Sequence, residues 1–481
     1  MKYIKFFWRF PKITVFFIMV VEIMLYFDRG VIASLLPHVK SNWGLNSIEE
    51  GAIASVFTIG FMCASPMWAH FGLRYRINKV IALGTLIFAL GAFSSGFWLS
   101  ITRGRIQKWA YYPFVISRFM VGFGESAMIS LAYTIVDELA PPEYKTLYMA
   151  AIMMSPSLGI ASGYGFCGVL VDLTRNWQII FYLESAVALT MAYLCLYTPF
   201  HGYKRLLLKQ AKAPAVEFPS VALPDITMPH QEEAVSELSE STSIISHKDK
   251  PIIHSVTSAI PPLVKNPVYL SIVAVSVIYG AIVGALTFWC PTYLQERLSV
   301  YDISEANINK LSNLGFGAIV FISSVFGTAL GALVLDKSGG AVGWRGVMRA
   351  MYQSFLYISI ALPFGFVVFI IRDGALLNVY GLFALFLIAM FFVLCIAAPF
   401  QVALNNCVPP ELRHFANAYQ TFLLHALGDF PSPTIFGFIK QFSNITVSML
   451  VMWGMLIPGL CFLLLAGTLS LYNDRRNKPI K

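Results

Sequence analysis

Charged side chains are scarce in this chain. Lysine, arginine, aspartate and glutamate make up 12% of its 481 residues, whereas a soluble protein carries about 25%. This shortage excludes an ordinary water-soluble globular protein of this length, because its surface could not be covered with polar groups. Hydrophobic residues make up 57% of the chain and the mean hydropathy is +0.69. Lipid is therefore the expected solvent for most of the molecule.

Sequence patterns typical of metal sites, disulfide frameworks and catalytic centres are also missing. The seven cysteines are scattered with no metal-site or disulfide spacing, and most lie in apolar runs as small packing residues. Nothing resembles a nucleophile elbow, a phosphate-binding glycine loop or a metal-binding helix. We therefore expect no enzyme activity, no metal and no cofactor, although coupling to protons is compatible with the sequence.

The net charge of +9 has two interpretations. Basic proteins bind nucleic acid, but in a membrane protein positive charge is expected in loops beside anionic lipid head groups. We favour lipid contacts and expect no nucleic-acid partner. Lys2, Lys5, Arg9 and Lys12 precede the first apolar run. That run is too long for a signal peptide and is expected to stay as the first helix.

Twelve apolar runs are long enough to cross a membrane as helices, which takes about 20 residues. They cover residues 13–39, 51–71, 80–99, 112–136, 147–171, 178–200, 267–293, 311–335, 350–371, 376–400, 415–439 and 447–472. The stretch 201–265 between them is rich in Pro, Ser, Glu and Lys, which predicts a soluble, mobile linker. The sequence predicts an all-α membrane protein with six-helix bundles in residues 1–200 and 266–481.

Basic residues set the expected orientation. Lysine and arginine are concentrated in the segments that are cytoplasmic when both termini are placed in the cytoplasm. Arg103, Arg105 and Lys108 are an exception, since this placement puts their loop on the opposite side.

Motifs of the first half recur in the second in the same order. Gly30 and Pro37 have the spacing of Gly284 and Pro291. The loop 141–145 (Pro-Pro-Glu-Tyr-Lys) recurs as 409–413 (Pro-Pro-Glu-Leu-Arg), and beyond these loops Gly159 and Gly168 match Gly428 and Gly437. These matches predict a parallel six-plus-six repeat about an axis along the membrane normal.

Four charged residues lie deep inside predicted spans: Asp28, Arg29, Arg118 and Glu125. A charge at the bilayer centre costs roughly 2.5–3.5 kcal/mol on the more lenient membrane-insertion scales. Such residues therefore indicate a transport path or a conformational switch inside the membrane protein. Arg118 and Glu125 are seven residues apart and share one helix face. The carboxyl group of Glu125 is predicted either to bind and release a proton or to form a static ion pair that locks two helices together.

The other polar residues within spans leave several interpretations open. Asp28 is expected to face a central cavity, while its neighbour Arg29 points elsewhere and reaches an adjacent helix. Glu22 can serve the cavity or helix packing, and Glu184 is expected near a span end in contact with solvent. His425 and Asp429, one turn apart, are expected to hydrogen-bond in a structural or a substrate-binding role.

Several motifs together resemble one known family. Residues 26–29 (Tyr-Phe-Asp-Arg) with Leu36-Pro37, and residues 117–125 with their Arg and Glu, are similar to first- and fourth-helix signatures of the spinster family of the major facilitator superfamily. Asn266-Pro267 and residues 289–291 (Trp-Cys-Pro) resemble its seventh helix, and residues 424–433 its eleventh.

The resemblance implies a twelve-helix transporter that works by rocker-switch alternating access. Its expected substrate is a lysophospholipid or a phosphorylated sphingoid base. It implies that Asp28 and Glu125 take part in proton-linked switching, with Arg118 as their electrostatic partner. The expected substrate contacts are Arg118, Arg29, His425, Asp429 and Trp289.

The chain departs from the superfamily pattern in places. Leu73, between Gly72 and Arg74, replaces the aspartate of the clamp that closes the cytoplasmic side, although Asp336 resembles a related motif in the second half. Tyr133 and residues 155–157 (Ser-Pro-Ser) are expected to reshape the cavity.

Two alternatives are a carrier of small organic anions or sugars and a non-transporting membrane protein that senses a ligand. The expected partners are a lipid-like substrate and membrane lipids, and the expected state is a monomer. Residues 240–245 (Glu-Ser-Thr-Ser-Ile-Ile) resemble a sorting signal to late endosomes or lysosomes. The plasma membrane is the other expected location.

Overall fold

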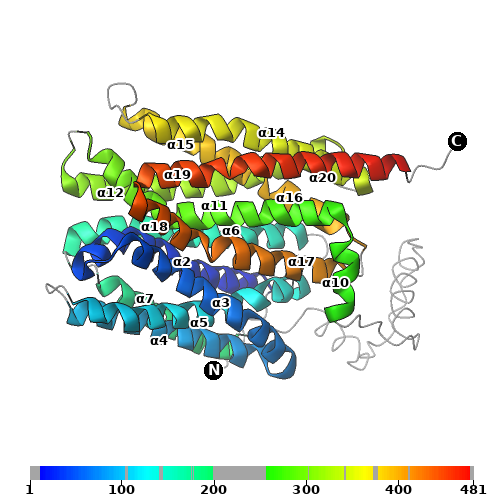
Figure 1. The fold of residues 1–481 in the computed structure, drawn as a ribbon. Coiled ribbons are helices and arrows are strands. Elements are labelled where there is room, and N and C mark those ends of the chain that lie inside the picture. The colour runs from blue at the N-terminus through cyan, green and yellow to red at the C-terminus, as the bar shows by residue number, and fades with distance from the viewer. Residues whose placement is uncertain are drawn as a thin grey trace, which may run out of the picture.

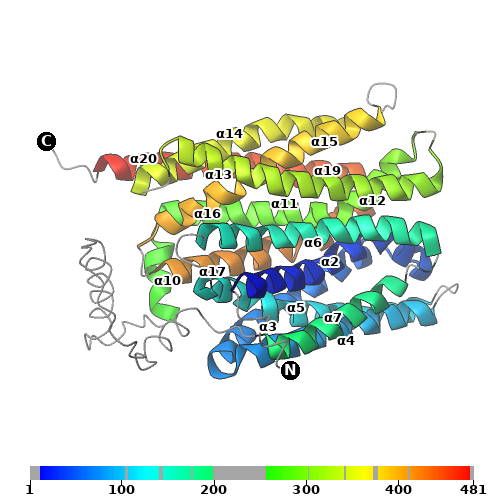
Figure 2. The same ribbon diagram turned by 180° about the vertical axis from the view of Figure 1, so that it is seen from behind.

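The computed structural model describes residues 11–102, 107–139, 145–174, 176, 178–198, 256–301, 303–340, 343–371, 378–409 and 412–476. Throughout this part of the chain the secondary structure is helical, with no strand. Most of the long helices run along one common direction (Figures 1 and 2).

Six long helices make up the first half and correspond to the six predicted spans, most of them extended at both ends. They are α2 (Pro11–Trp43), α3 (Ser47–Arg74), α4 (Ile77–Ile101), α5 (Tyr111–Leu139), α6 (Lys145–Thr174) and α7 (Ile179–Tyr197), with a short turn η1 (Lys108–Ala110) before α5. A capping box starts α3 after a tight connection: Asn46 Oδ1 accepts from the Glu49 amide at 2.8 Å, and Glu49 Oε2 accepts from the Asn46 amide at 3.0 Å.

The second half also contains six membrane-spanning segments, but four of them are each divided into two or three helical elements. Its elements are α11 (Pro267–Leu298), α12 (Glu305–Ile322), η3 (Ser323–Gly327), α13 (Thr328–Lys337), α14 (Gly343–Ile370), α15 (Val379–Leu394), α16 (Ala397–Asn406), α17 (Arg413–Leu423), η5 (Leu424–Asp429), α18 (Ser432–Phe442), α19 (Ile445–Gly454) and α20 (Leu456–Arg476). The insertions η3 and η5 are π-helical turns, a feature frequent at functional sites. Sequence periodicity gave no sign of these breaks.

A short helix, α10 (Val256–Val264), lies within the predicted linker and leads into α11. Most of the rest of the segment 201–265 lies outside the described residues.

Lipid-facing surfaces follow the expected composition. Nine helices of the described residues are long and apolar enough to span a membrane. α2 is not among them because its middle carries Glu22, Asp28 and Arg29. On α4 an exposed apolar stripe repeats at helical spacing and suits contact with acyl chains. It comprises Leu83, Leu86, Leu90, Phe93 and Phe97.

The glycines of the predicted repeat occupy equivalent packing positions in the two halves. A Cβ atom at Gly30 would lie 2.2 Å from the Ile160 carbonyl oxygen of α6, and one at Gly284 would lie 2.3 Å from Asp429 Oδ1 of η5. Only glycine permits such close helix approach. The predicted parallel repeat is therefore visible in the packing.

The second set of repeat glycines behaves in the same way. A Cβ at Gly159 would lie 2.5 Å from a carbonyl oxygen of α2, and one at Gly428 would lie 2.4 Å from a carbonyl oxygen of α11. Gly168 and Gly437 instead face the opposite half, where they approach α12 and α3.

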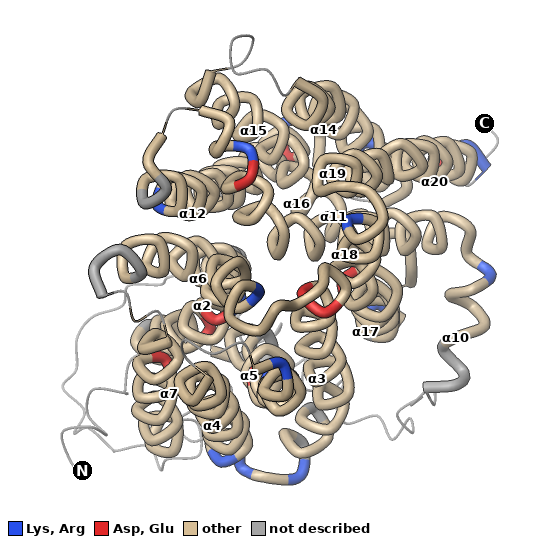
Figure 3. The backbone as a smooth tube through the Cα atoms, turned by 60° about the vertical axis from the view of Figure 1, so that its left-hand side comes forward, with Lys and Arg blue, Asp and Glu red and all other residues tan. Residues whose placement is uncertain are grey.

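The two halves lie side by side, and few charged residues lie on the helices that face one another (Figure 3). They meet through α2 with α11, α3 with α18 and α6 with α12. Hydrogen bonds between the halves gather toward the end where residues 44–46 join α2 to α3, which we call the sealed end. Ser55 Oγ donates to the Phe430 carbonyl oxygen at 2.6 Å, and the Ser47 amide donates to Gln441 Oε1 at 3.0 Å.

Candidate functional site

Asp28 of α2 and Arg118 of α5 form an ion pair that is almost fully buried. Arg118 Nη1 donates to the two carboxylate oxygens of Asp28 at 2.7 and 2.8 Å, and each side chain is 1% exposed. The Arg118 Nε and Nη2 atoms donate to Ser95 Oγ of α4 at 3.2 and 2.8 Å. Because a buried guanidinium needs acceptors for its donors, Asp28 and Ser95 hold Arg118 between three helices.

Arg29 forms a second ion pair with Glu125 of α5. Its Nε and Nη2 atoms donate to Glu125 Oε1 at 3.2 and 2.8 Å, whereas Glu125 Oε2 is buried without a hydrogen bond. The rings of Tyr26, Phe57 and Phe61 lie 4.7, 4.9 and 5.7 Å from the guanidinium. Glu125 is fully buried, but the Arg29 side chain is 24% exposed. Arg29 is therefore the more accessible of the two arginines.

These contacts show how the four predicted residues are paired. Arg118 and Glu125 lie two turns apart, about 10 Å along the helix axis, and each binds a residue of α2. The prediction that Arg29 reaches a partner on an adjacent helix is confirmed. The expectation that only Asp28 faces the central cavity is wrong, because Arg29 lines it together with Asp28 and is the more exposed of the two. The hydrogen-bonding partner of Glu125 is Arg29, so Arg118 acts on it only at longer range.

His425 and Asp429 form the predicted pair on the π-helical turn η5. His425 Nδ1 lies 3.1 Å from Asp429 Oδ2, and the His425 ring lies 5.3 Å from the ring of Phe61 in the other half. Asp429 also interacts electrostatically with Arg29. Arg29 is therefore attracted by Glu125 in its own half and by Asp429 across the interface.

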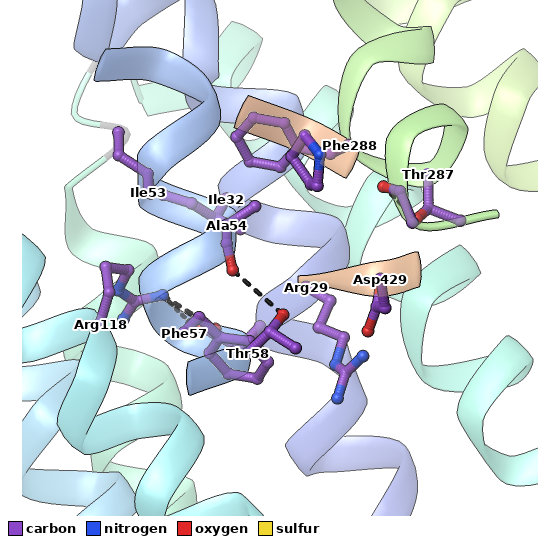
Figure 4. A pocket seen from close by; sticks show the side chains of 13 residues that line it. Arg29, Ile32, Ile53, Ala54, Phe57, Thr58, Arg118, Thr287, Phe288 and Asp429 are labelled. Atoms are coloured by element: carbon purple, nitrogen blue, oxygen red, sulfur yellow. Dashed lines mark hydrogen bonds and ion pairs between the residues drawn. The ribbon is translucent and has the colours of Figure 1, made fainter. Parts of the chain in front are cut away.

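A cavity of about 60 Å³ lies between the halves at this point. Arg29 and Arg118 approach it from the first half, and Asp429 and Thr287 from the second (Figure 4). It is lined by Asp28, Arg29, Ile32, Ile53, Ala54, Phe57, Thr58, Arg118, Gly284, Thr287, Phe288, Asp429 and Pro433. This volume holds a few water molecules and is below the roughly 300–1,000 Å³ of ordinary ligand sites. In this conformation the cavity accepts a small polar group.

Two similar six-helix bundles with a charged cavity at their interface form the architecture of a membrane carrier. Residues 18–433 match the family model of the Major Facilitator Superfamily. The chain belongs to that superfamily. This superfamily consists of transporters and not of enzymes.

Curated relatives narrow the comparison to spinster proteins. The chain is 25% identical over 436 residues to "Probable sphingolipid transporter spinster homolog 1" of Arabidopsis thaliana, covering 87% of this chain and 80% of that one. It is 23% identical over 450 residues to "Sphingosine-1-phosphate transporter SPNS2" of Mus musculus, covering 92% and 72% of the two chains. The predicted resemblance to the spinster family is confirmed.

Solved structures confirm the predicted fold. A bacterial homologue of the human lysosomal transporter Spinster, inward-facing and unoccupied, matches with a TM-score of 0.70 and 13% identity over 96% of this chain and 98% of that one. The inward-open xylose transporter XylE from E. coli matches with a TM-score of 0.64 and 13% identity over 95% of both chains.

Two of the five predicted substrate contacts, Trp289 and His425, lie outside the cavity in this conformation. Trp289 is fully buried, stacks on Phe436 with ring centres 4.9 Å apart, and donates to the Pro433 carbonyl oxygen at 3.1 Å. Neither Trp289 nor His425 lines the cavity described above.

The prediction for Glu184 was wrong. This residue was expected in contact with solvent, but it is 4% exposed, because α7 packs this face against α4 and α2. Glu22 is 1% exposed and interacts electrostatically with Glu125, so it borders the charged cluster.

An ion-pair cluster at the sealed end was missed by the sequence reasoning. The Glu50 side chain is 1% exposed and lies 3.0 Å from Lys40 and 3.5 Å from Lys440 of the other half. Lys440 Nζ lies 4.6 Å from the Trp289 ring centre. Both Glu50 and Lys440 sit near the ends of their spans, but only the pairing of α3 with α18 brings them together.

Some sequence predictions fall outside what the structure describes. These are the side chains of Leu73 and Tyr133, the basic residues Arg103 and Arg105, most of the loop 141–145 and the sorting motif 240–245.

Proposed function

We propose that this protein carries an amphiphilic lipid with an anionic head group, such as a lysophospholipid or a phosphorylated sphingoid base, by proton-linked alternating access. The observation that carries the proposal is the placement of two arginines, Arg29 and Arg118, at a cavity between the halves. The sphingolipid and sphingosine-1-phosphate transport named for the relatives supports the same substrate class.

The head group binds first at Arg29. A guanidinium offers a rigid fork of donors that matches phosphate oxygens, and Arg29 is the arginine with an exposed surface. A phosphate that takes these donors displaces Glu125, whose second oxygen already lacks a hydrogen bond.

The displaced carboxylate links the substrate to a proton. A buried charge without a partner is costly, so Glu125 takes up a proton once Arg29 turns to the head group. Loss of the substrate restores the ion pair and releases the proton. In the same way, Asp28 takes up a proton when it loses Arg118 as its partner.

The lipid chain lies along apolar side chains at the bundle interface. Ile32, Phe57 and Phe288 line the cavity beside the arginines, and each buried CH₂ group contributes about 0.8 kcal/mol. The present cavity of about 60 Å³ is too small for such a chain. The halves must therefore rock apart to admit it, and the cross-half contacts of the sealed end must break in the opposite state.

Flux into proteoliposomes tests this function. We expect uptake of labelled sphingoid phosphate or lysophospholipid that responds to a pH gradient, with no uptake of labelled sugar. Glu125→Gln and Asp28→Asn should lower the response to the gradient by tenfold or more, because a neutral amide cannot exchange the proton. Glu49→Gln is the matched control, since Glu49 pairs with Lys108 at 2.7 Å within the same half.

Equal pH response in wild type, Glu125→Gln and Asp28→Asn would contradict proton coupling through these residues. Ligand binding without flux would instead identify a sensing protein.

The small cavity favours one second candidate, a carrier of small organic anions. Arg29 and Arg118 would bind a carboxylate as well as a phosphate. Competition separates the two, because a short organic acid that blocks lipid uptake at equal concentration would favour this candidate.

We further propose a monomer with both termini in the cytoplasm, located in late endosomes, lysosomes or the plasma membrane. Accessibility of terminal epitope tags before and after permeabilisation tests the orientation. Imaging of the double variant Ile244→Ala, Ile245→Ala tests the sorting signal, and an unchanged distribution would exclude it. Native mass spectrometry tests the monomer.

A further inference from the structure

Glu184 of α7 is a buried acid that the proposed mechanism does not use. It is 4% exposed, and among the described residues no donor reaches either of its carboxyl oxygens. An ionised carboxylate left without a donor in an apolar interior is strongly unfavourable. The carboxyl group of Glu184 must therefore either carry a proton or take part in the function of the protein.

The polar neighbour of Glu184 is another acid. The carboxyl group of Asp28 on α2, against which α7 packs, interacts directly with that of Glu184. Ionised carboxylates only accept hydrogen bonds, so two of them form one only when a proton lies between them. The geometry that leaves Glu184 without an ordinary donor thus provides a site for one proton.

The charged side chains around Glu184 are compatible with one bound proton at this site. From α5, Arg118 and Glu125 act on Glu184, and from α2 Asp28 does so. The only charged residue of α4 is Lys79, near the start of that helix, while Ser95 donates its own proton to the Gly91 carbonyl oxygen.

The four paired residues Asp28, Arg29, Arg118 and Glu125 sum to zero charge in their ionised forms. An ionised Glu184 would add an uncompensated negative charge to a cluster that is already balanced.

We propose that Glu184 and Asp28 share one proton beside Arg118, forming an acid pair that stores a proton at the edge of the cavity. The proton lies on the carboxyl group of Glu184 while Asp28 remains ionised against Arg118. If Arg118 turns toward an anion, Asp28 loses its partner and the pair takes up a second proton from water. Only this last use rests on the proposed function, because storage of the first proton needs no substrate.

Infrared difference spectroscopy on the purified full-length protein in lipid nanodiscs, without substrate, tests the pair. We expect a protonated carboxyl band near neutral pH that is lost in Glu184→Gln and retained in the control Glu296→Gln, whose side chain is exposed. Asp28→Asn should also abolish the band. The new amide donates to Glu184, and Arg118 is left to compensate an ionised Glu184.

Two results would overturn the proposal. Spectra of wild type and Glu184→Gln that coincide in the carboxyl region would show that Glu184 holds no proton. A Glu184 band that persists in Asp28→Asn would show that the proton is not shared, and this variant supplies the answer even if Glu184→Gln does not fold. Since no substrate is present, either result leaves the lipid-flux assay to judge the proposed function separately.

Discussion

Lys440 of α18 and Glu50 of α3 form an ion pair across the two halves, with 3.5 Å between Lys440 Nζ and Glu50 Oε2. Lys40 holds the same carboxylate from its own half at 3.0 Å, and the Trp289 ring packs against the Lys440 ammonium. The pair joins the halves at the sealed end and must separate whenever that end opens. It therefore biases the equilibrium between the two states of the carrier.

A cavity cysteine reports opening at the sealed end. Thr58 lines the cavity and is 6% exposed, so Thr58→Cys should react with a bulky thiol reagent added from that side only after the end opens. The exposed residues Cys63 and Cys461 are replaced by alanine in this background.

Glu50→Gln should favour the state that is open at the sealed end. It removes the charge that attracts both Lys40 and Lys440, and leaves two cations facing each other across the interface. We expect labelling of the Thr58→Cys reporter to rise about tenfold, equivalent to about 1.4 kcal/mol. Glu49→Gln, whose partner lies in its own half, should leave the rate unchanged. Equal rates in both variants would show that Glu50 does not bias the equilibrium.

Gly437→Ala should prevent the sealed end from closing fully. A Cβ at Gly437 would lie 2.1 Å from the Ser47 carbonyl oxygen of the other half, a contact that backbone atoms cannot accommodate. The same cysteine reporter should label faster than in the parent protein. Gly454→Ala is the control, because a Cβ there has no heavy atom within 4 Å. Slower labelling in Gly437→Ala would argue against a steric role.

Ser95→Ala should lower the stability of the first half. The substitution leaves two buried donors of Arg118 without their acceptor, which costs about 1–3 kcal/mol. We expect a lower midpoint in thermal unfolding of the detergent-solubilised protein. Ser354→Ala is equally buried, but its hydroxyl donates to a carbonyl oxygen of its own helix, so its midpoint should change little. Equal midpoints for the two variants would mean that Arg118 finds another acceptor.

Arg29→Lys should weaken substrate binding more than it disturbs the fold. Lysine keeps the positive charge, but it loses the paired donors to Glu125 and the flat contact with the aromatic rings. We expect the KM for an anionic lipid to rise about tenfold in proteoliposomes, with normal yield and unfolding temperature. Arg345→Lys, in an exposed pair with Asp474, should leave the KM unchanged. An unchanged KM in Arg29→Lys would place the head group elsewhere.

Much of the fold could be predicted because each signal was local in the sequence. Length and hydropathy gave the spans, and the matched pair Gly30 and Gly284 gave the repeat, since close helix packing demands glycine at equivalent positions. The charges of Asp28 and Arg118 identified the site, because an ionised side chain inside an apolar helix needs a partner. The breaks at η3 and η5 could not be predicted, since a π-helical turn leaves the apolar pattern almost unchanged.

By itself, the sequence determined that the chain is a two-bundle membrane carrier with arginines and carboxylates buried in its first half. Only the tertiary structure decided the partners: Asp28 with Arg118, Arg29 with Glu125, Glu184 beside Asp28, and Glu50 with Lys440. Spacing along one helix fixes which face a side chain occupies, but a partner on another helix depends on how the helices pack. That packing arises from contacts between residues far apart in the chain, and no local pattern records it.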